Sequence, residues 1–274
     1  MRKKRSVNLY IGIIILAVIA AVCVVSFFYL PYEPTKMDNA HAYLAPGAEA
    51  GSHLLGTDQF GRDILSRLMV GSRTVLLIGF VSVFFGAIGG MLLGASAGMI
   101  KHLYGSVVMR AVEGLMAFPG TLLALMLIAV IGKGETAVII AISIYTIVPF
   151  ARLSYTLILE NEGSSMIKAA HSFNVGRVRL FTHYYLPSLL PRLITQFSAS
   201  VGSAIMTEAA LSFLGLGVQP PDASWGLMLS EAKQYVLLHP YLAVAPGIAI
   251  FVTVLGFQLL SDGLNDILIG RSSD

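Results

Sequence analysis

The sequence contains little charge and almost no cysteine. Lys, Arg, Asp and Glu make up 12% of its 274 residues, and Cys23 is the single cysteine. One cysteine excludes an internal disulfide, and because Cys23 lies in an apolar run we interpret it as a packing residue. The charged fraction is also far below the ~25% of ordinary soluble domains. The two shortages therefore argue against a soluble domain and against a disulfide framework.

The sequence also lacks the motifs of enzymes and nucleotide-binding proteins. It has no zinc-binding His pair on a helix, no GxSxG elbow and no Cys–His arrangement. Residues 132–135 resemble a phosphate loop only superficially, because Leu127 stands where that motif requires glycine. The six histidines fall on both predicted sides of a membrane, and we interpret His53 and His239 as surface residues. We expect no catalytic residue, no metal site and no cofactor bound by this chain.

Long apolar runs are abundant instead. Hydrophobic residues make up 56% of the chain, its mean hydropathy is +0.78, and several runs have the ~20 residues that cross a bilayer. We therefore predict an all-α integral membrane protein with about six transmembrane helices. The expected spans lie near 9–30, 73–100, 106–132, 136–152, 193–217 and 241–261.

The basic residues predict how these helices are oriented. The predicted inside carries twice as many of the 18 Lys and Arg residues as the predicted outside, which favours cytoplasmic termini. A signal peptide could also begin with MRKKR, but the first apolar run is too long and no small-residue cleavage pattern precedes Pro31. We expect a cytoplasmic N-terminus and first transmembrane helix over 1–30, an external segment over 31–72, a helical core over 73–268 and a cytoplasmic tail over 269–274.

The external segment contains a compact polar motif, LGTDQFGRD followed by Ser66-Arg67. Gly, Asp and Arg so close together are typical of loops that are capped and tied by side-chain hydrogen bonds. A docking surface is the alternative, and we favour the structural role. Thr57 or Asp58 could also cap a helix that lies along the membrane surface, with an apolar face of Ile64, Leu65, Leu68 and Met69. The motif residues are Gly56, Thr57, Asp58, Gly61, Arg62 and Asp63.

The second expected span carries four glycines at a strict four-residue spacing. Residues four apart lie on one helix face, so these glycines would let another helix approach closely. A merely flexible helix is the alternative, but a period unbroken over three turns favours helix packing. The four residues are Gly86, Gly90, Gly94 and Gly98.

Two acidic residues lie within or near expected spans. Glu208 lies deep in the fifth span and should face protein or a water-filled path rather than lipid, which makes it a pathway candidate. Glu113 lies near the membrane interface, where we expect a structural role. In the same third span, Phe118-Pro119 should kink or interrupt the helix.

A long polar interruption, which we call the finger (Glu160–Arg192), separates the fourth and fifth spans. A set of apolar residues at helical spacing predicts a short amphipathic helix. Asn174 then suits a turn, because asparagine tolerates a left-handed backbone, and Pro187 ends a second apolar set. An interfacial loop lying on lipid is the alternative to a helix-turn-helix that docks into a soluble partner. The first apolar set is Met166, Ile167, Ala170 and Phe173.

These residues leave two classes of function open. One is a transport subunit, in which spans packed by small residues form a path and the finger receives force from another protein. The other is a membrane enzyme that uses intramembrane acids. An enzyme should bring several polar residues to one membrane depth, whereas Glu208 is the one deep acid. Transport is therefore the favoured class.

The finger resembles the EAA coupling loop of binding-protein-dependent ABC importers, whose pattern is E-A-A-x3-G-x9-I-x-L-P. Here Lys168-Ala169-Ala170 is followed after three residues by Asn174, and after nine more by Tyr184-x-Leu186-Pro187. The spacing is kept, while the first acid, the glycine and the isoleucine are replaced. The resemblance implies that these residues, with Arg177 and Arg179, form the loop that couples to an ATPase.

Three further stretches resemble the oligopeptide, dipeptide and nickel permeases of this group. Residues 55–67 look like their external signature, 208–226 like their fifth-helix segment, and 262–266 like their C-terminal ending, with Ser261 and Asn265 as departures. The resemblance is to the "C"-type permease, the shorter of two paired membrane subunits. Residues 73–268 would then be the permease core, with the coupling loop at about 160–192.

This resemblance implies a type I ABC importer permease in the inner membrane of a bacterium or archaeon. A sister permease would complete the pathway, two ATPase subunits holding ATP and Mg would bind the fingers, and an external substrate-binding protein would dock on the other side. No nucleic acid is expected. Family members carry peptides, nickel, metal chelates and other solutes; short peptides are our default, and nickel or a metal chelate is the alternative. A membrane enzyme or a channel is a remote alternative.

Overall fold

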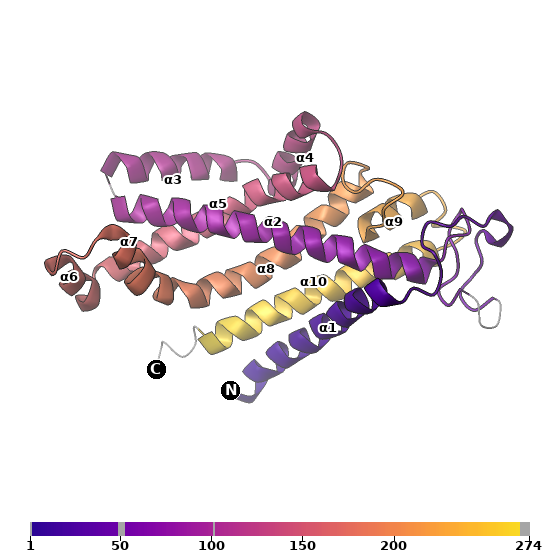
Figure 1. The fold of residues 1–274 in the computed structure, drawn as a ribbon, viewed down its shortest axis with the longest axis horizontal. Helices are drawn as coiled ribbons and strands as arrows, with labels where there is room; N and C mark the ends of the chain where they lie inside the picture. Colours follow the sequence, from indigo (N-terminus) through magenta and orange to yellow (C-terminus); the bar gives the residue numbers. More distant parts are fainter. Residues whose placement is uncertain (1, 49–52, 101, 269–274) are drawn as a thin grey trace.

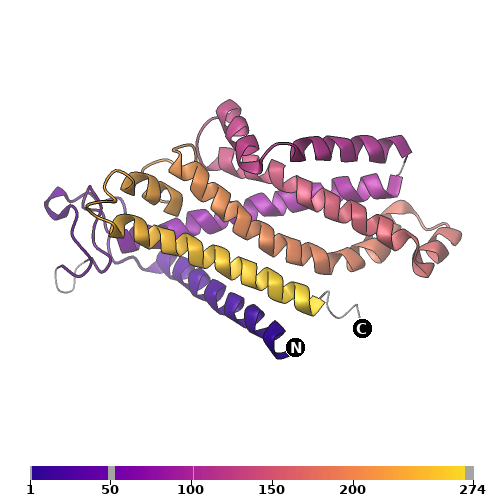
Figure 2. The same ribbon diagram turned by 180° about the vertical axis from the view of Figure 1, so that it is seen from behind.

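The chain forms a bundle of long helices in the computed structural model, which describes residues 2–48, 53–100 and 102–268. Helices α1, α2, α5, α8 and α10 run side by side (Figures 1 and 2). Helix α9 lies at one end, the α9 end, and α6 and α7 lie at the other, the finger end. The tail 269–274 lies outside the described residues. The helices are α1 (Arg2–Phe28), a 3-10 turn (Asn39–His41), α2 (Ile64–Ile100), α3 (His102–Met116), α4 (Gly120–Ile131), α5 (Glu135–Glu162), α6 (Ser165–Ser172), α7 (Arg177–Leu180), a π-helix (Phe181–Tyr185), α8 (Leu186–Phe213), α9 (Trp225–Ala232) and α10 (Tyr241–Leu268).

Helix α2 is longer than the sequence predicts. It has 37 residues, about 55 Å at the usual helical rise, and it begins at Ile64 rather than near residue 73. Asp63 starts it, because one carboxylate oxygen accepts hydrogen bonds from both the backbone N–H and the hydroxyl of Ser66, each at 2.7 Å. Ile64 and Met69 are buried. This corrects the expected separate surface helix: its residues form the first turns of α2, and the expected boundary at residue 72 falls inside that helix.

Among the described residues, four helices are long and apolar enough to cross a membrane, or five if one bent pair counts as a span. The four lie in α1, α2, α5 and α10. Helix α8 has a comparable 28 residues and packs along α2 and α10. Its buried polar residues, which include Ser198, Ser200, Thr207, Glu208 and Ser212, lower its hydropathy. The expected six spans therefore correspond to these four helices, α8 and the bent pair.

The bent pair corrects the expected third span over 106–132. Helix α3 ends at Met116, α4 begins at Gly120, and the two axes differ by 92°. The predicted interruption at Phe118-Pro119 is confirmed, since Pro119 is the N-cap of α4. The chain turns almost at a right angle there, so 106–132 is a broken span or a re-entrant loop rather than a kinked helix.

Helix α1 packs along α10 through glycines that the sequence reading overlooked. A Cβ placed on Gly12 would lie 2.6 Å from the backbone nitrogen of Leu260, and one on Gly263 would lie 2.6 Å from the Cα of Leu9. The two backbones therefore approach closely, as in membrane helix pairs built on small residues. At the far end of α1, the guanidinium of Arg73 donates to the Ser26 hydroxyl at 2.6 Å and stacks over the Phe27 ring.

Candidate functional site

The polar motif between α1 and α2 folds into a tight loop at the α9 end. The Thr57 side chain is fully buried; its hydroxyl accepts the backbone N–H of Leu44 at 2.9 Å and donates to the His41 carbonyl. Gly61 has φ of +72°, and a Cβ there would lie 1.8 Å from the Asp38 carbonyl oxygen. A side chain at this position would thus meet both backbone strain and backbone atoms. The loop conformation requires glycine here.

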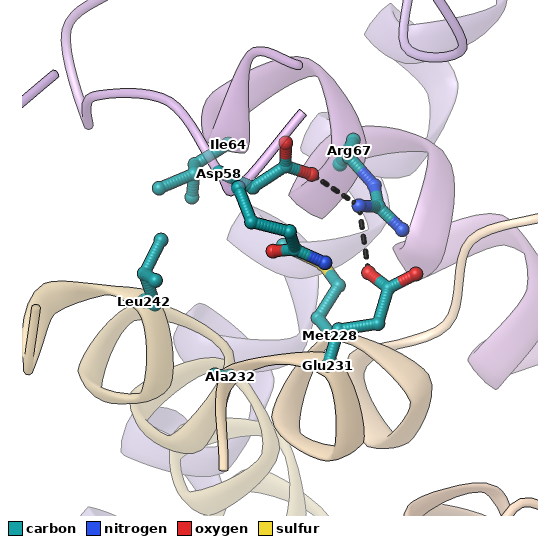
Figure 3. A pocket seen from close by; sticks show the side chains of 8 residues that line it. Asp58, Ile64, Arg67, Met228, Glu231, Ala232 and Leu242 are labelled. Carbon is teal, nitrogen blue, oxygen red and sulfur yellow. Dashed lines mark hydrogen bonds and ion pairs between the residues drawn. The ribbon is translucent and has the colours of Figure 1, made fainter. Parts of the chain in front are cut away.

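A buried charge cluster, which we define as Asp58, Arg62, Arg67 and Glu231, joins this loop to α9. One carboxylate oxygen of Asp58 accepts from Arg62 Nε and Arg67 Nη1, each at 2.6 Å. Glu231, on α9, lies 2.8 Å from Arg67 Nη1 and 3.0 Å from Arg62 Nη2. Figure 3 shows Arg67 between the two carboxylates. The other Asp58 oxygen accepts the backbone N–H groups of Phe60 and Arg62.

The charge cluster stabilises the structure rather than leaving groups open to a ligand. Its two arginines and two carboxylates balance in charge, and all four side chains are mostly buried. Charges removed from water are tolerated when they are paired and hydrogen-bonded in this way, and removing one partner leaves an uncompensated charge. The cluster therefore holds α9 against the start of α2.

Asp63 makes a second set of contacts beside the charge cluster. Its carboxylate caps α2 through Ser66, and its other oxygen lies 3.0 Å from Nδ1 of His53. The His53 ring stacks on Tyr32, with ring centroids 4.2 Å apart. His53 was expected to be a plain surface residue, whereas its side chain is largely buried. His239, a further histidine at this end, stacks on Tyr43.

The four regularly spaced glycines of α2 all face α5. A Cβ on Gly90 would lie 2.3 Å from the Ile147 carbonyl oxygen, and one on Gly94 would lie 2.1 Å from that of Ala151. Gly86 faces Thr146 and Gly98 faces Ile158 in the same way. The absence of side chains lets the two helix backbones come into contact over three turns. Helices α2 and α5 thus form the most closely packed pair of the bundle.

Glu208 has no exposed surface. Its Oε1 accepts the hydroxyl of Ser212 at 2.7 Å, and that hydroxyl oxygen in turn accepts the backbone N–H of Val218. Its Oε2 has no hydrogen-bond partner among the described residues. Next to it, Gly226 of α9 packs against the backbone of Ala209. In this packing Glu208 lies beside the contact with α9, and its assignment as a pathway residue stays a prediction.

The middle of the finger is a helix, a turn and a second, one-turn helix. Ser164 caps α6, and its hydroxyl accepts the N–H of Ile167 at 3.3 Å. The chain then reverses at Asn174, which has φ of +51°, as its left-handed tolerance predicts. Ile167 and Ala170 are buried, and Lys168 and Ala169 are exposed. The predicted amphipathic helix is confirmed.

The finger presents apolar and basic side chains to its surroundings. Phe173 is 83% exposed and Val178 is 79% exposed, and Met166 is also exposed. Arg177 and Arg179 are exposed between them, and in the described part of the chain neither forms an ion pair. Large apolar side chains at the tip of so small a unit are typical of a surface that another protein covers.

The base of the finger differs from the sequence reading. Pro187 was expected to end a pattern, but it lies in the first turn of α8, where a missing N–H costs nothing. Leu186 also belongs to α8, and Tyr184 lies in the π-helix that joins α7 to α8. Tyr185 and Leu189 are buried and anchor this junction. The coupling-loop pattern therefore extends through the finger into the first turn of α8.

Sequence reasoning missed Glu231, the second carboxylate of the charge cluster. It lies more than 160 positions from Arg62 and Arg67, and no local spacing relates the three residues. Arg67 carried a weak signal, because it stands one turn into a helix that Asp63 caps. One indication of Glu231 was present in the sequence: it is itself an acidic residue in the short, mostly apolar helix that begins at Trp225.

Comparison with known proteins agrees with this architecture. Residues 90–273 match the family described as "Binding-protein-dependent transport system inner membrane component". The chain is 41% identical over 221 residues to the "Glutathione transport system permease protein GsiD" of Pectobacterium atrosepticum, covering 80% of this chain and 73% of that protein. It is 34% identical over 258 residues to the "Nickel transport system permease protein NikC" of Escherichia coli, covering 94% of this chain and 92% of that protein.

Among solved structures, a chain from "Inward facing conformations of the MetNI methionine ABC transporter" is similar in fold. Its TM-score is 0.59 at 19% identity, with 74% of this chain and 94% of that chain covered. This likeness shows the type I ABC importer permease fold. The chain therefore belongs to the family of binding-protein-dependent transport system inner membrane components, and it is a permease subunit of an ABC importer.

Proposed function

We propose that the finger is the surface through which a cytoplasmic ATPase subunit drives this permease. The observation that carries the proposal is the exposure of Phe173 and Val178 beside Arg177 and Arg179. Aromatic residues and arginine contribute most of the binding energy of many interfaces. The exposed Lys168 and Ala169, the buried Ala170 and the turn at Asn174 lie where the family's coupling motif lies. ATP and Mg would belong to the ATPase, and this chain would hold neither.

The orientation that this requires is also a proposal. The finger end carries Lys168, Arg177, Arg179 and Arg192, and basic residues favour the cytoplasmic side. Both termini would then be cytoplasmic. The α9 end, with the polar motif Gly56–Asp63, would face outward toward a substrate-binding protein. A second, different permease subunit would complete the pathway.

Movement would pass from the finger to the membrane through its junction with α8. The π-helix runs directly into α8 at Leu186, and Arg192 of α8 pairs with Glu160 of α5 at 3.1 Å. A rigid-body shift of the finger would therefore move the ends of both helices. Transport would alternate between two packings of stiff helices, biased by nucleotide at the finger end and by the loaded binding protein at the α9 end.

Short peptides are the substrate that we propose. One relative is named for glutathione, a tripeptide, and shares 41% identity with this chain, whereas the relative named for nickel shares 34%. Nickel or a metal chelate is the second candidate, because the relative named for nickel aligns with almost the whole of this chain. Uptake in cells that lack this chain alone distinguishes them. We expect loss of labelled short peptide and unchanged labelled nickel; the opposite result would establish the second candidate.

The coupling proposal has its own test, Phe173→Asp. Because Phe173 is exposed, we expect an intact fold but about tenfold weaker co-purification of the ATPase, equivalent to ~1.4 kcal/mol. Peptide uptake should fall with it. Leu237→Asp is the matched control: Leu237 is 95% exposed in the segment between α9 and α10, so ATPase binding should persist. Charge reversal at Arg177 and Arg179 should act like Phe173→Asp, and unchanged ATPase binding in both variants would refute contact at this face.

A further inference from the structure

A pocket of about 540 Å³ lies between α3, the end of α2 and the end of α5. Its polar lining residues are Ser106 and Arg110, about one turn apart on α3, and Tyr155 on α5. Its apolar lining residues include Leu103 and Val107 on α3 and Leu159 on α5. None of these residues belongs to the finger or to the charge cluster. The pocket is therefore lined by both polar and apolar side chains.

Arg110 carries a positive charge that no described residue neutralises through an ion pair. It is exposed, and in the described ranges it has no hydrogen bond and no ion pair. Glu113, the nearest acid along α3, is exposed and makes no ion pair with it there. A second arginine, Arg152, lies one turn from Tyr155 on the same face of α5, and its Nη1 lies 3.4 Å from Met116 Sδ. Arg110 is the one charged residue among those that line the pocket.

We infer that the pocket lies near the level where the hydrocarbon core ends. Arg73 of α2 meets Ser26 at the end of α1, and we take this contact as one boundary. A core of ~30 Å takes about 20 residues of α2, so the opposite boundary lies near Leu93. Gly105 of α3 packs against Ala97, and α3 runs back along α2, which puts Arg110 about level with Leu92. Tyrosine and arginine are typical of this interfacial level.

Helix α3 lies at the edge of the bundle (Figures 1 and 2). Among the described residues its main contacts are with α2 and α5, and we infer that the pocket opens toward the surrounding bilayer. Basic pockets between membrane helices at this level bind anionic lipid headgroups. The apolar lining residues would lie along an acyl chain while Arg110 meets the phosphate.

We propose that this pocket binds an anionic phospholipid, with the headgroup phosphate on Arg110, Ser106 and Tyr155 and one chain along Leu103, Val107 and Leu159. In the orientation proposed above the lipid belongs to the cytoplasmic leaflet. The site is independent of which solute the importer carries. A lipid held there would hold α3 against α5 from outside, where the chain itself supplies few contacts.

The test uses the full chain in lipid nanodiscs with a tryptophan reporter, Leu103→Trp. Leu103 is 79% exposed at the rim of the pocket, and the only native tryptophan, Trp225, is buried at the opposite end. Brominated lipids quench tryptophan on contact. We expect brominated phosphatidylglycerol to quench the reporter with about fivefold preference over brominated phosphatidylcholine, which is the effect of one arginine near a headgroup. Equal quenching by the two lipids would overturn the proposal.

Three variants of the reporter chain locate the effect. Arg110→Gln should reduce the preference to near one, while Lys133→Gln, which removes an exposed charge between α4 and α5, should preserve it. Ser106→Phe fills the pocket and keeps Arg110, so it should also lower the preference. A preference that survives Ser106→Phe would mean that Arg110 acts as a plain surface charge, and the pocket proposal would fail. Size-exclusion profiles confirm that each variant is folded.

Two further measurements separate lipid from other occupants of the same chemistry. Inorganic phosphate in excess should leave the quenching unchanged, because the acyl chain contributes to binding; displacement by phosphate would assign the pocket to a soluble anion. Quenching should also persist after co-expression with the sister permease. If assembly abolishes it, the pocket is part of a subunit interface, and the lipid proposal is wrong.

Discussion

Charged side chains are buried and paired at one end of this permease and exposed at the other. At the α9 end, Asp58 and Glu231 neutralise two arginines that are buried with them. At the finger end, Arg177 and Arg179 are exposed beside exposed apolar side chains. The first surface is complete within one chain, whereas the second presents groups that a partner would cover. In this chain, buried and paired charged residues therefore indicate a role in stabilising the fold. Exposed charged residues on a short helical segment indicate a surface for a partner subunit.

The largest expected effect is that of Asp58→Ala at the α9 end. The change leaves Arg62 and Arg67 buried with Glu231 as their only remaining counter-ion, so we expect a loss of about 3–5 kcal/mol. Thermal unfolding of the detergent-solubilised chain, followed by size exclusion, measures it. Arg177→Ala at the finger end is the control, with an expected change within ~0.5 kcal/mol. Similar losses for the two variants would remove the contrast between the ends.

The next effect is that of Gly90→Leu, between the two ends. A leucine Cβ would lie 2.3 Å from the Ile147 carbonyl oxygen, so α2 and α5 must separate, at a cost of about 1–3 kcal/mol or more. Gly247→Leu on α10 makes the same change where a Cβ meets nothing within 4 Å. We expect poor assembly and lower stability for the first variant only. A fully assembled and fully active Gly90→Leu permease would contradict the packing role.

The smallest effect is that of Asn174→Ala in the finger. At φ of +51° alanine has a strain of about 1–2 kcal/mol that asparagine partly avoids. Because the finger packs against little else, the loss should be local. Hydrogen exchange of the α6 amides should accelerate about fivefold or more while global unfolding stays unchanged. Asn174→Gly, which accepts this backbone, should show no acceleration; if it does, strain at residue 174 is not the cause.

Local features of the fold could be predicted from sequence. The α6 amphipathic pattern, the turn at Asn174 and the interruption at Pro119 depend on residues within a few positions of one another. The glycines of α2 likewise recur every four residues, so the sequence alone shows that they share one helix face. It does not show that α5 is the helix that packs against them. Each of these signals is encoded in one short stretch of chain.

Features that join distant segments could not be predicted in this way. Glu231 reaches Arg67 only because α9 folds back over the start of α2. The 92° angle between α3 and α4 depends on packing against α5, since proline interrupts a helix without fixing a direction. Gly12, Gly256 and Gly263 are scattered over the first and last helices, and no repeat in either helix reveals that they meet.

The pairing of α1 with α10 has a consequence for how the protein is made. The ribosome delivers α1 first and α10 last, and at ~5–20 residues per second the interval is tens of seconds. During translation the face of α1 around Gly12 is therefore exposed to lipid until α10 has been synthesised. Closure of the bundle has to wait until α10 has been synthesised, and a nascent chain that stops before Tyr241 cannot complete it.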